Sequence, residues 1–305
     1  ETLLKESRTY QPTAKTIAAA YIKDYETEYK KSIADPEAFW NREAKELEWF
    51  SPWSKVLEWN YPWAKWFVGA RCNIAYNCLD RHMKTWRKNK VALIWVGEND
   101  QERIFTYAEL YRQVNRCANA LKKLGLKQGD RVTIYLPKIP EQVIAMLACA
   151  RIGVIHSVVY SGFSAPALAN RINDAEAKLV ITADVGFDRG KTIQLKPVVD
   201  EAIKTCPTID HVVVVRREVQ GPALSAPKEI DWKEWIESER PICEAAQLDA
   251  EAPLYILYTS GTTGKPKGVV HVHGGYMVGT YTTTKYVFDL KDDDIYFCVA
   301  DPGWV

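Results

Sequence analysis

Short apolar runs alternate with amphipathic helical stretches along most of this chain, and this alternation constrains its fold more than any other feature. Thr106 and Glu109 have the spacing of a capping box at the start of one such helix. Alternating strands and helices predict right-handed β-α-β units, and therefore an α/β fold with mostly parallel sheets flanked by helices. The expected strands are 91–96, 131–136, 154–159, 179–182, 211–215, 254–258, 269–272 and 294–299, and the expected helices are 106–124, 140–152, 165–175, 195–205 and 232–238.

The first 90 residues differ from the rest in composition and in their pattern of apolar residues, and we expect them to form a separate Trp-rich extension. Helical runs are expected at 16–31 and from Pro36 to Leu47, with Asp35 as the N-cap of the second. Residues 49–67 contain many aromatics and two prolines, which predicts an irregular segment whose Trp side chains anchor it to a larger body. Residues 91–305 are then the first part of a large domain.

Charge and cysteine content exclude several classes of protein. The chain has 40 Lys and Arg against 39 Asp and Glu, so no overall field attracts nucleic acid or an anionic membrane. Seven scattered cysteines without a C-x-x-C pair do not suggest a disulfide framework or a zinc site. The N-terminus lacks the apolar core of a secretory signal, and charged or small residues interrupt the most apolar stretch, 143–160. We therefore expect a reduced, cytoplasmic location.

One segment has the composition of a phosphate-binding loop. Two apolar strands enclose ten residues, 259–268, that hold four hydroxyls, three Gly and two Lys. Glycines permit positive φ or close approach to a ligand, and backbone N–H groups, hydroxyls and Lys side chains can surround phosphate oxygens. The spacing matches neither a Walker loop nor G-x-G-x-x-G. The alternative is a hairpin loop whose lysines face water.

Other polar groupings are weaker candidates, and no metal site is expected. His271 and His273 have no third ligand, so packing at a strand end is the preferred interpretation. Cys78 and His82 lie one helical turn apart and are interpreted as structural. The acidic residues 292–294 are expected to form a solvated turn.

Residues 259–268 resemble the phosphate loop of the adenylate-forming superfamily, and further segments resemble its short-chain acyl-CoA synthetases, with acetate-activating members nearest. These segments are SIADPEAFW at 32–40, LEWFSPWSKVL at 47–57, WFVG at 66–69, NIAYNCLDRH at 73–82, YSGF at 160–163, ITAD at 181–184 and DPGWV at 301–305. The resemblance covers nearly the whole chain. Enzymes that activate propionate or acetoacetate share the N-terminal segments and remain alternatives.

The resemblance implies a two-step reaction with small-molecule substrates and neither nucleic acid nor membrane as partner. A carboxylate, here acetate, would attack the α-phosphorus of Mg²⁺-bound ATP, and coenzyme A would then displace AMP to give the thioester. A loop of Gly, Thr and Lys, together with Mg²⁺, is suited to the charge that collects on the leaving pyrophosphate.

The resemblance also implies roles for individual residues. Lys267 and Thr263 would be catalytic. The ATP phosphates would lie against Thr259, Ser260, Gly261, Thr262, Thr263, Gly264, Lys265 and Lys267; coenzyme A would lie against Gly162, Asp188, Arg189, Gly190 and Lys191; Trp304 and Val305 would border the acyl pocket. Asp188 stands where bacterial members carry Arg, and Arg189 is expected to compensate. The alternative for Arg189 and Lys191 is a solvated basic turn.

Several parts of the resembled enzymes have no counterpart here. The motifs for adenine and ribose, the determinant of acyl specificity and the C-terminal lid with its catalytic lysine would all follow Val305. The large domain is therefore expected to be incomplete at its C-terminus, and the chain alone inactive. Two rivals remain open: a non-catalytic module that binds nucleotide or coenzyme A, and an interaction scaffold descended from such an enzyme.

Overall fold

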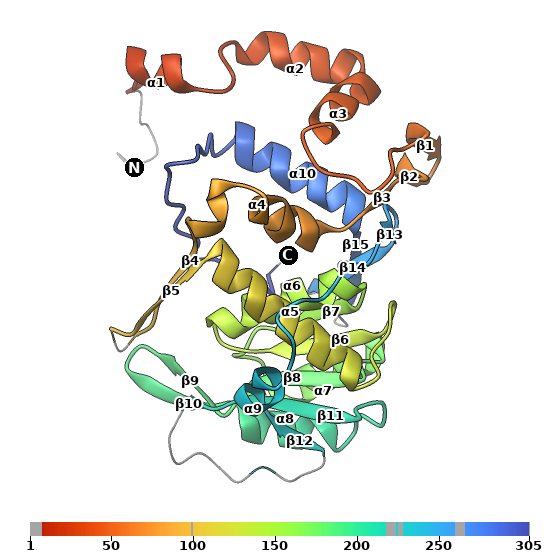
Figure 1. Cartoon of the computed structure of the whole chain (residues 1–305), viewed down its shortest axis with the longest axis vertical. Helices are drawn as coiled ribbons and strands as arrows, with labels where there is room; N and C mark the ends of the chain where they lie inside the picture. Colours follow the sequence, from red (N-terminus) through yellow and green to blue (C-terminus); the bar gives the residue numbers. More distant parts are fainter. Residues whose placement is uncertain (1–7, 99, 218–223, 225–227, 260–265, 305) are drawn as a thin grey trace. The chain divides into compact units, whose positions relative to one another are not determined.

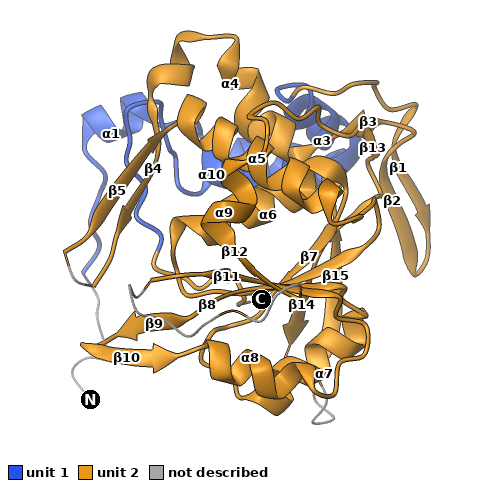
Figure 2. Cartoon of the chain, turned by 60° about the horizontal axis from the view of Figure 1, so that its bottom comes forward, with its two compact units in different colours: residues 1–47, 277–298 blue, residues 48–276, 299–305 orange. Residues whose placement is uncertain are grey.

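The structure is a computed structural model that describes residues 8–98, 100–217, 224, 228–259 and 266–304. Internal contacts divide the chain into two compact units, coloured separately in Figure 2. Unit 1 comprises Glu1–Leu47 and Met277–Cys298, and unit 2 comprises Glu48–Tyr276 and Val299–Val305.

Unit 2 is built on a seven-stranded sheet in the order β12-β11-β8-β6-β7-β14-β15. All neighbouring pairs are parallel except β14 and β15, which form an antiparallel hairpin at the edge. The expected α/β class with a mostly parallel sheet is confirmed. The strands are β6 (Arg131–Tyr135), β7 (Ile155–Val158), β8 (Leu179–Ala183), β11 (His211–Val215), β12 (Glu229–Asp231), β14 (Pro253–Thr259) and β15 (Lys267–Val272) (Figure 1).

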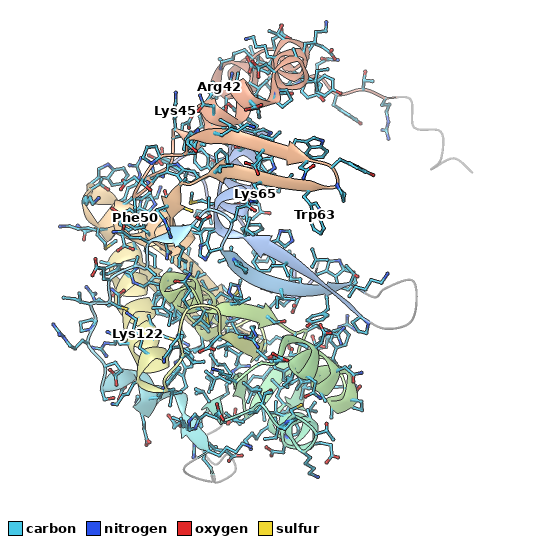
Figure 3. All side chains as sticks on the ribbon, turned by 90° about the vertical axis from the view of Figure 1, so that its right-hand side faces the viewer. Arg42, Lys45, Phe50, Trp63, Lys65 and Lys122 are labelled. Atoms are coloured by element: carbon cyan, nitrogen blue, oxygen red, sulfur yellow. The ribbon has the colours of Figure 1, made fainter. Side chains whose placement is uncertain are left out.

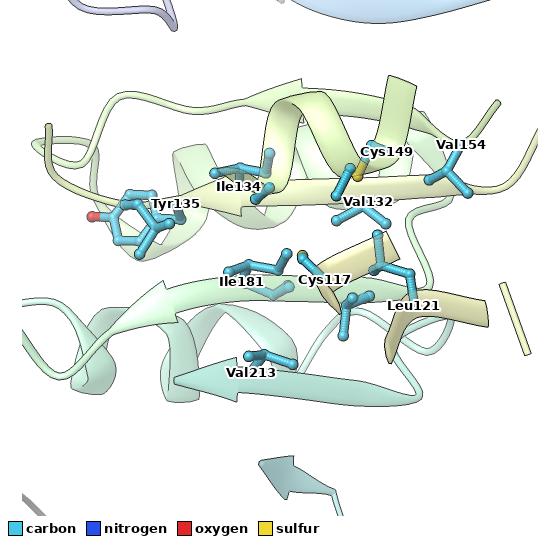
Figure 4. Packing of buried hydrophobic residues seen from close by; sticks show 14 of the residues in the cluster. Cys117, Leu121, Val132, Ile134, Tyr135, Cys149, Val154, Ile181 and Val213 are labelled. Carbon is cyan, nitrogen blue, oxygen red and sulfur yellow. The ribbon is translucent and has the colours of Figure 1, made fainter. Parts of the chain in front are cut away.

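Helices cover both faces of this sheet. Figure 2 shows α5 (Tyr107–Lys123), α6 (Pro140–Ile152) and α9 (Trp232–Glu237) on one face, and α7 (Ala165–Ala175) and α8 (Lys196–Ile203) on the other. The expected capping box at α5 is confirmed, because Thr106 and Glu109 each accept the other's backbone N–H. Side chains of α5 and α6 pack on the strands; those labelled in Figure 4 include Cys117, Leu121, Val132, Ile134, Cys149, Ile181 and Val213. Removing such apolar surface from water is the main stabilising contribution.

Short hairpins and turns surround the sheet in unit 2. The expectation of an irregular segment at 49–67 is wrong, because β1 (Lys55–Asn60) and β2 (Trp63–Val68) pair as an antiparallel hairpin. Pro62 lies in the turn between the two strands, and Trp63 is 74% exposed rather than an anchor (Figure 3). The other elements are β3 (Arg71–Cys72) with β13 (Leu248–Asp249), β4 (Val91–Val96) with β5 (Glu102–Thr106), β9 (Val185–Asp188) with β10 (Lys191–Gln194), α4 (Arg81–Met83), a π-helical turn at Tyr76–Asp80 and a 3₁₀ turn at Trp86–Asn89.

Unit 1 contains α1 (Ala14–Ala19), α2 (Tyr25–Ala34), α3 (Pro36–Ala44) and most of α10 (His273–Tyr286). The single helix expected at 16–31 is wrong, because α1 ends at Ala19 and Asp24 caps a new helix by accepting the N–H of Thr27. Asp35 caps α3 as expected, although α3 ends at Ala44 rather than Leu47.

A buried charge network joins α3 to α10 within unit 1. The Glu43 carboxylate is fully buried, accepts the Tyr286 hydroxyl at 2.8 Å and lies 3.5 Å from Lys285 Nζ. Burial alone would lower the pKa of Lys285, but its bond to Glu46 and the charge of Glu43 raise it. The charged form of Lys285 is therefore the stable one in this setting.

The strand expected at 294–299 is wrong. These residues form no strand, and Ile295 and Phe297 are 83% and 82% exposed. An apolar alternating run does not by itself form a strand, because the ladder needs a neighbour that supplies hydrogen bonds.

Candidate functional site

The carboxyl ends of β6, β7 and β14 meet at one edge of the sheet in unit 2. After β6 the chain enters α6 on one face, and after β7 it enters α7 on the other face (Figure 2). Adjacent parallel strands whose connections diverge in this way leave a crevice at their carboxyl ends, where open α/β sheets bind ligands. The expected site segments lie mostly at this edge.

The candidate phosphate loop connects β14 to β15. Thr259 and Lys267 are opposite one another in the hairpin register, so both ends of the loop are held at the sheet edge. The residues between them that were predicted to bind phosphate, namely Ser260, Gly261, Thr262, Thr263, Gly264 and Lys265, lie outside the described residues. The structure therefore positions the base of the loop.

Gly268 has a packing role that differs from the expected one. It belongs to β15 and does not adopt positive φ. A Cβ added at Gly268 would lie 3.1 Å from Ile256 Cγ2 and 3.4 Å from Tyr258 Cε1. The close approach at Gly268 is therefore to side chains of the neighbouring strand, which a larger residue would push aside.

Tyr258 fastens the start of the loop to α7. Its hydroxyl donates to Asp174 Oδ2 at 2.7 Å, and burial together with this bond raises the pKa of Tyr258. The Arg171 guanidinium lies over two rings, 4.4 Å from the Phe163 centroid and 5.6 Å from that of Tyr258. Neither Arg171 nor Asp174 was singled out from the sequence.

The predicted coenzyme A residue Gly162 lies in the turn after β7. The Tyr135 hydroxyl is 2.8 Å from the carbonyl oxygens of both Ser161 and Phe163, which ties the turn to β6. Burial raises the pKa of Tyr135 to about 12, so the hydroxyl keeps its proton. A Cβ on Gly162 would meet Tyr160 Cε1 at 2.4 Å, so any larger residue at this position displaces the Tyr160 ring.

The other predicted coenzyme A residues form the β9–β10 turn. Asp188 pairs with Lys191, while Arg189 and Gly190 adopt φ of +51° and +72°. The N–H groups of Arg189 and Gly190 donate to the two carboxylate oxygens of Glu98, at 2.8 and 3.0 Å, and these bonds lower the pKa of Glu98. Two successive N–H groups in such a turn make a small anion-binding concavity, here filled by a carboxylate.

The turn at 188–191 and the candidate loop are attached to strands that are not neighbours in the sheet. The turn comes after β8 in the chain and the loop comes after β14, and two strands, β6 and β7, lie between β8 and β14. The Arg217 guanidinium lies 4.5 Å from the centroid of the Phe187 ring, and Phe187 directly precedes Asp188 in the sequence. Arg217 was not singled out from the sequence. Burial lowers the pKa of Arg217.

The predicted acyl residues lie in the segment 301–305. Lys138 Nζ, after β6, donates to the Val299 carbonyl at 3.1 Å, and Gly303 N donates to Asp301 Oδ1 at 2.8 Å. A Cβ on Gly303 would be 3.0 Å from Tyr160 N, so this segment lies against the end of β7. Trp304 is 80% exposed, and Val305 lies outside the described residues.

The histidines near the hairpin are packed as expected. His271 stacks on Tyr255 with ring centroids 4.7 Å apart, and the fully buried His273 accepts the N–H of Ile74 at 3.4 Å. Within the described ranges no three His, Cys, Asp or Glu side chains are grouped to hold a metal ion. None of the helices described is both long and apolar enough to cross a bilayer.

Two family models match the chain in succession. The model of the AMP-binding enzyme family matches residues 79–305, and that of the acetyl-coenzyme A synthetase N-terminus matches residues 25–78. The chain therefore belongs to the AMP-binding enzyme family. Within that family it carries the N-terminal region characteristic of acetyl-coenzyme A synthetases.

Individual relatives agree with this assignment. Acetyl-coenzyme A synthetases from Deinococcus radiodurans and Gemmatimonas aurantiaca are each 50% identical over the whole of this chain, which covers 48% and 47% of their lengths. The solved structure of acetoacetyl-CoA synthetase from Streptomyces lividans matches 95% of this chain and 45% of its own, with a TM-score of 0.85 and 30% identity. The chain thus spans about half the length of these relatives.

Proposed function

We propose that the protein carrying this chain activates acetate with ATP, through acetyl-AMP, and transfers the acetyl group to coenzyme A with release of AMP and pyrophosphate. The observation that carries the proposal is the 50% identity to acetyl-coenzyme A synthetases over the whole length of the chain. A site at the carboxyl edge of the parallel sheet supports it.

In this proposal the loop between β14 and β15 binds the ATP phosphates through residues 259–265 and Lys267. Lys267 and Thr263 act at the leaving pyrophosphate, where a positioned cation and hydroxyl stabilise the charge that develops. The residue types fit an anionic group, because Lys, hydroxyl and backbone N–H groups are all hydrogen-bond donors. Thr259 and Lys267, paired across the hairpin, place the two ends of the loop at the sheet edge. Mg²⁺ prefers oxygen ligands, and in this proposal the ATP phosphates would supply them.

The remaining roles extend the same proposal. Gly162 and the turn of Asp188, Arg189, Gly190 and Lys191 bind coenzyme A, and Trp304 with Val305 borders the acyl group. Residues 1–90 form an extension and 91–305 the first part of the large domain. A cytoplasmic location fits the seven cysteines, which are all free of disulfides. The near-even charge balance fits a protein with neither nucleic acid nor membrane as partner.

The first test is acetate-dependent exchange between ATP and pyrophosphate in the full-length protein, with Lys267→Ala and Gly264→Leu as variants. Loss of one charged contact at the leaving group costs about 2–4 kcal/mol, so exchange should fall by roughly 30- to 1,000-fold. Exchange at the wild-type rate in both variants would remove the loop from the reaction. Residues 1–305 alone are expected to form no acetyl-CoA.

The acid itself is tested by the same assay. Acetoacetate is the second candidate, because one solved structure similar to this chain is an acetoacetyl-CoA synthetase. Propionate completes the comparison, because it differs from acetate by one methylene. A higher kcat/KM with acetoacetate or propionate than with acetate would replace acetate in the proposal.

A further inference from the structure

Arg171 is a nearly buried cation at the base of the candidate loop. Its side chain on α7 is 8% exposed, and Nη1 donates to the Ala167 carbonyl of the same helix at 2.8 Å. Among the residues that the structure describes, no carboxylate oxygen lies within ion-pair distance of Arg171. Its contacts in place of an ion pair are two aromatic faces.

A buried cation without an acidic partner is unfavourable for folding alone. Desolvation of the charge is costly, and an apolar side chain of similar volume fills a buried site at least as well. A planar guanidinium, however, can stack on an aromatic ring on each side, which neither an apolar side chain nor an ammonium group reproduces. The geometry therefore favours a role in joining the two rings.

The first ring, Phe163, belongs to the turn proposed to bind coenzyme A. It follows Gly162 directly, and its carbonyl oxygen lies 2.8 Å from the Tyr135 hydroxyl. Its ring also meets that of Tyr160 edge to face, with centroids 5.7 Å apart. Phe163 therefore contacts the other end of the turn, at Tyr160, so a shift of Phe163 would disturb the turn as a whole.

The second ring, Tyr258, belongs to the proposed phosphate loop. It precedes Thr259 directly, pairs with Gly268 across the hairpin and packs against it. Its hydroxyl binds Asp174, which lies one helical turn beyond Arg171 on α7. One face of α7 therefore contacts Tyr258 through both Arg171 and Asp174.

We propose that Arg171 is a positioning residue that fixes the Gly162–Phe163 turn relative to the base of the phosphate loop, so that both half-reactions depend on it. This inference rests on the proposed function. Because the guanidinium touches one ring from each segment, its loss disturbs adenylate formation and coenzyme A use together. Loss of either ring contact alone disturbs the half-reaction of that segment.

The experiment measures, in the full-length protein, the rate of ATP–pyrophosphate exchange, the KM for coenzyme A and the melting temperature. A stacked and partly desolvated cation contributes on the order of tenfold to an equilibrium. Arg171→Met should therefore lower exchange and raise the KM for coenzyme A, each by about tenfold. Arg171→Lys keeps the charge but not the planar stack, and should resemble Arg171→Met.

Two further variants separate the sides of the stack. Tyr258→Leu removes the ring on the loop side, together with the hydroxyl bond to Asp174, and should lower exchange while leaving the KM for coenzyme A within about twofold. Phe163→Leu removes the other ring and should do the reverse. Such a split is not expected from a general loss of stability.

Arg131→Met is the matched control. Arg131 also binds α7, through the Ala175 carbonyl at 2.6 Å, but it does so at the amino end of β6. It should lower the melting temperature without the paired kinetic change. The inference is overturned if Arg171→Met leaves both parameters near wild type, if Arg171→Lys restores both, or if Arg131→Met reproduces both changes. A wild-type protein without acetate-dependent exchange would instead refute the proposed function.

Discussion

Gly153 and Gly125 both adopt left-handed backbone, with φ of +75° and +84°, yet their surroundings differ. A Cβ on Gly153, the C-cap of α6, would lie 2.8 Å from Leu248 Cδ2 and 3.0 Å from Gln128 Cγ. A Cβ on Gly125 would meet nothing within 4 Å. A substitution at Gly125 therefore tests backbone strain alone, whereas one at Gly153 tests backbone strain together with crowding.

We predict that Gly153→Ala destabilises the chain more than Gly125→Ala. Left-handed backbone costs an alanine about 1–2 kcal/mol at either site. Crowding adds about 1–3 kcal/mol at Gly153 alone, because Leu248 belongs to a buried strand that cannot easily move. Urea unfolding of both variants measures the difference, and equal losses would contradict the geometry.

At the residue scale, the sequence indicated the loop but not the side chains that hold its base. Lys267 and Thr259 were found because they lie inside one dense motif. Asp174 lies 84 residues from Tyr258, and Glu98 lies 91 residues from Arg189. Contacts over such separations depend on the folded topology, and no local pattern announces them. The roles of the loop residues themselves stay predictions.

At the element scale, the β9–β10 hairpin depends on a residue of another hairpin. Both oxygens of the Glu98 carboxylate, just after β4, accept N–H groups of the Arg189–Gly190 turn. These bonds lower the pKa of Glu98, so they persist above its ordinary value and are lost as the pH falls through the lowered one. The effect is local, because Glu98 is exposed.

We predict that Glu98→Ala increases hydrogen exchange at the Arg189 and Gly190 amides several-fold while leaving the melting temperature nearly unchanged. The reason is that the variant removes both acceptors without removing apolar packing. Glu102→Ala, at the start of β5 in the same hairpin, is the matched control and should leave these amides protected. Unaltered exchange in Glu98→Ala would show that the carboxylate does not hold the turn.

Elements with both periodicity and end signals were predicted best. The bounds of α6 and α7 agree with expectation, helped at α6 by Pro140 at its start and Gly153 at its end. The failures at 16–31, 49–67 and 294–299 share one cause. In each case the prediction used a local signal and missed a second feature that decides the structure. At 16–31 that feature is a second helix cap at Asp24, and at 49–67 it is the pairing of two strands across Pro62. At 294–299 it is a neighbouring strand, which this segment does not have among the described residues.

At the scale of the whole molecule, two buried histidines link stability to pH. His156 in β7 and His273 at the start of α10 are 4% and 0% exposed. Burial lowers the pKa of His156 to about 3, assisted by the charge His273 would carry, and burial lowers the pKa of His273 to about 4. His156 lies beside the Tyr255 ring at 5.6 Å, and His273 Nδ1 accepts the Ile74 N–H, which requires an unprotonated nitrogen.

These values fix the sign of the pH dependence of folding. Both pKa values are lower in the folded state than the ordinary value of 6.5, so below pH 6.5 the unfolded chain binds more protons. The free energy of unfolding therefore falls as the pH drops from about 6.5 toward 4. Each histidine contributes a loss of about 2 kcal/mol between pH 7 and pH 5.

We predict that His273→Asn removes one of these two contributions, because the amide oxygen can still accept the Ile74 N–H but does not titrate. Urea unfolding at pH 8, 7, 6 and 5 measures the slope, and the pH 8 value isolates the packing cost, since both rings are neutral there in either state. The wild type should lose about 2 kcal/mol more than the variant between pH 7 and pH 5. Parallel pH profiles would mean that His273 takes up its proton while the chain remains folded.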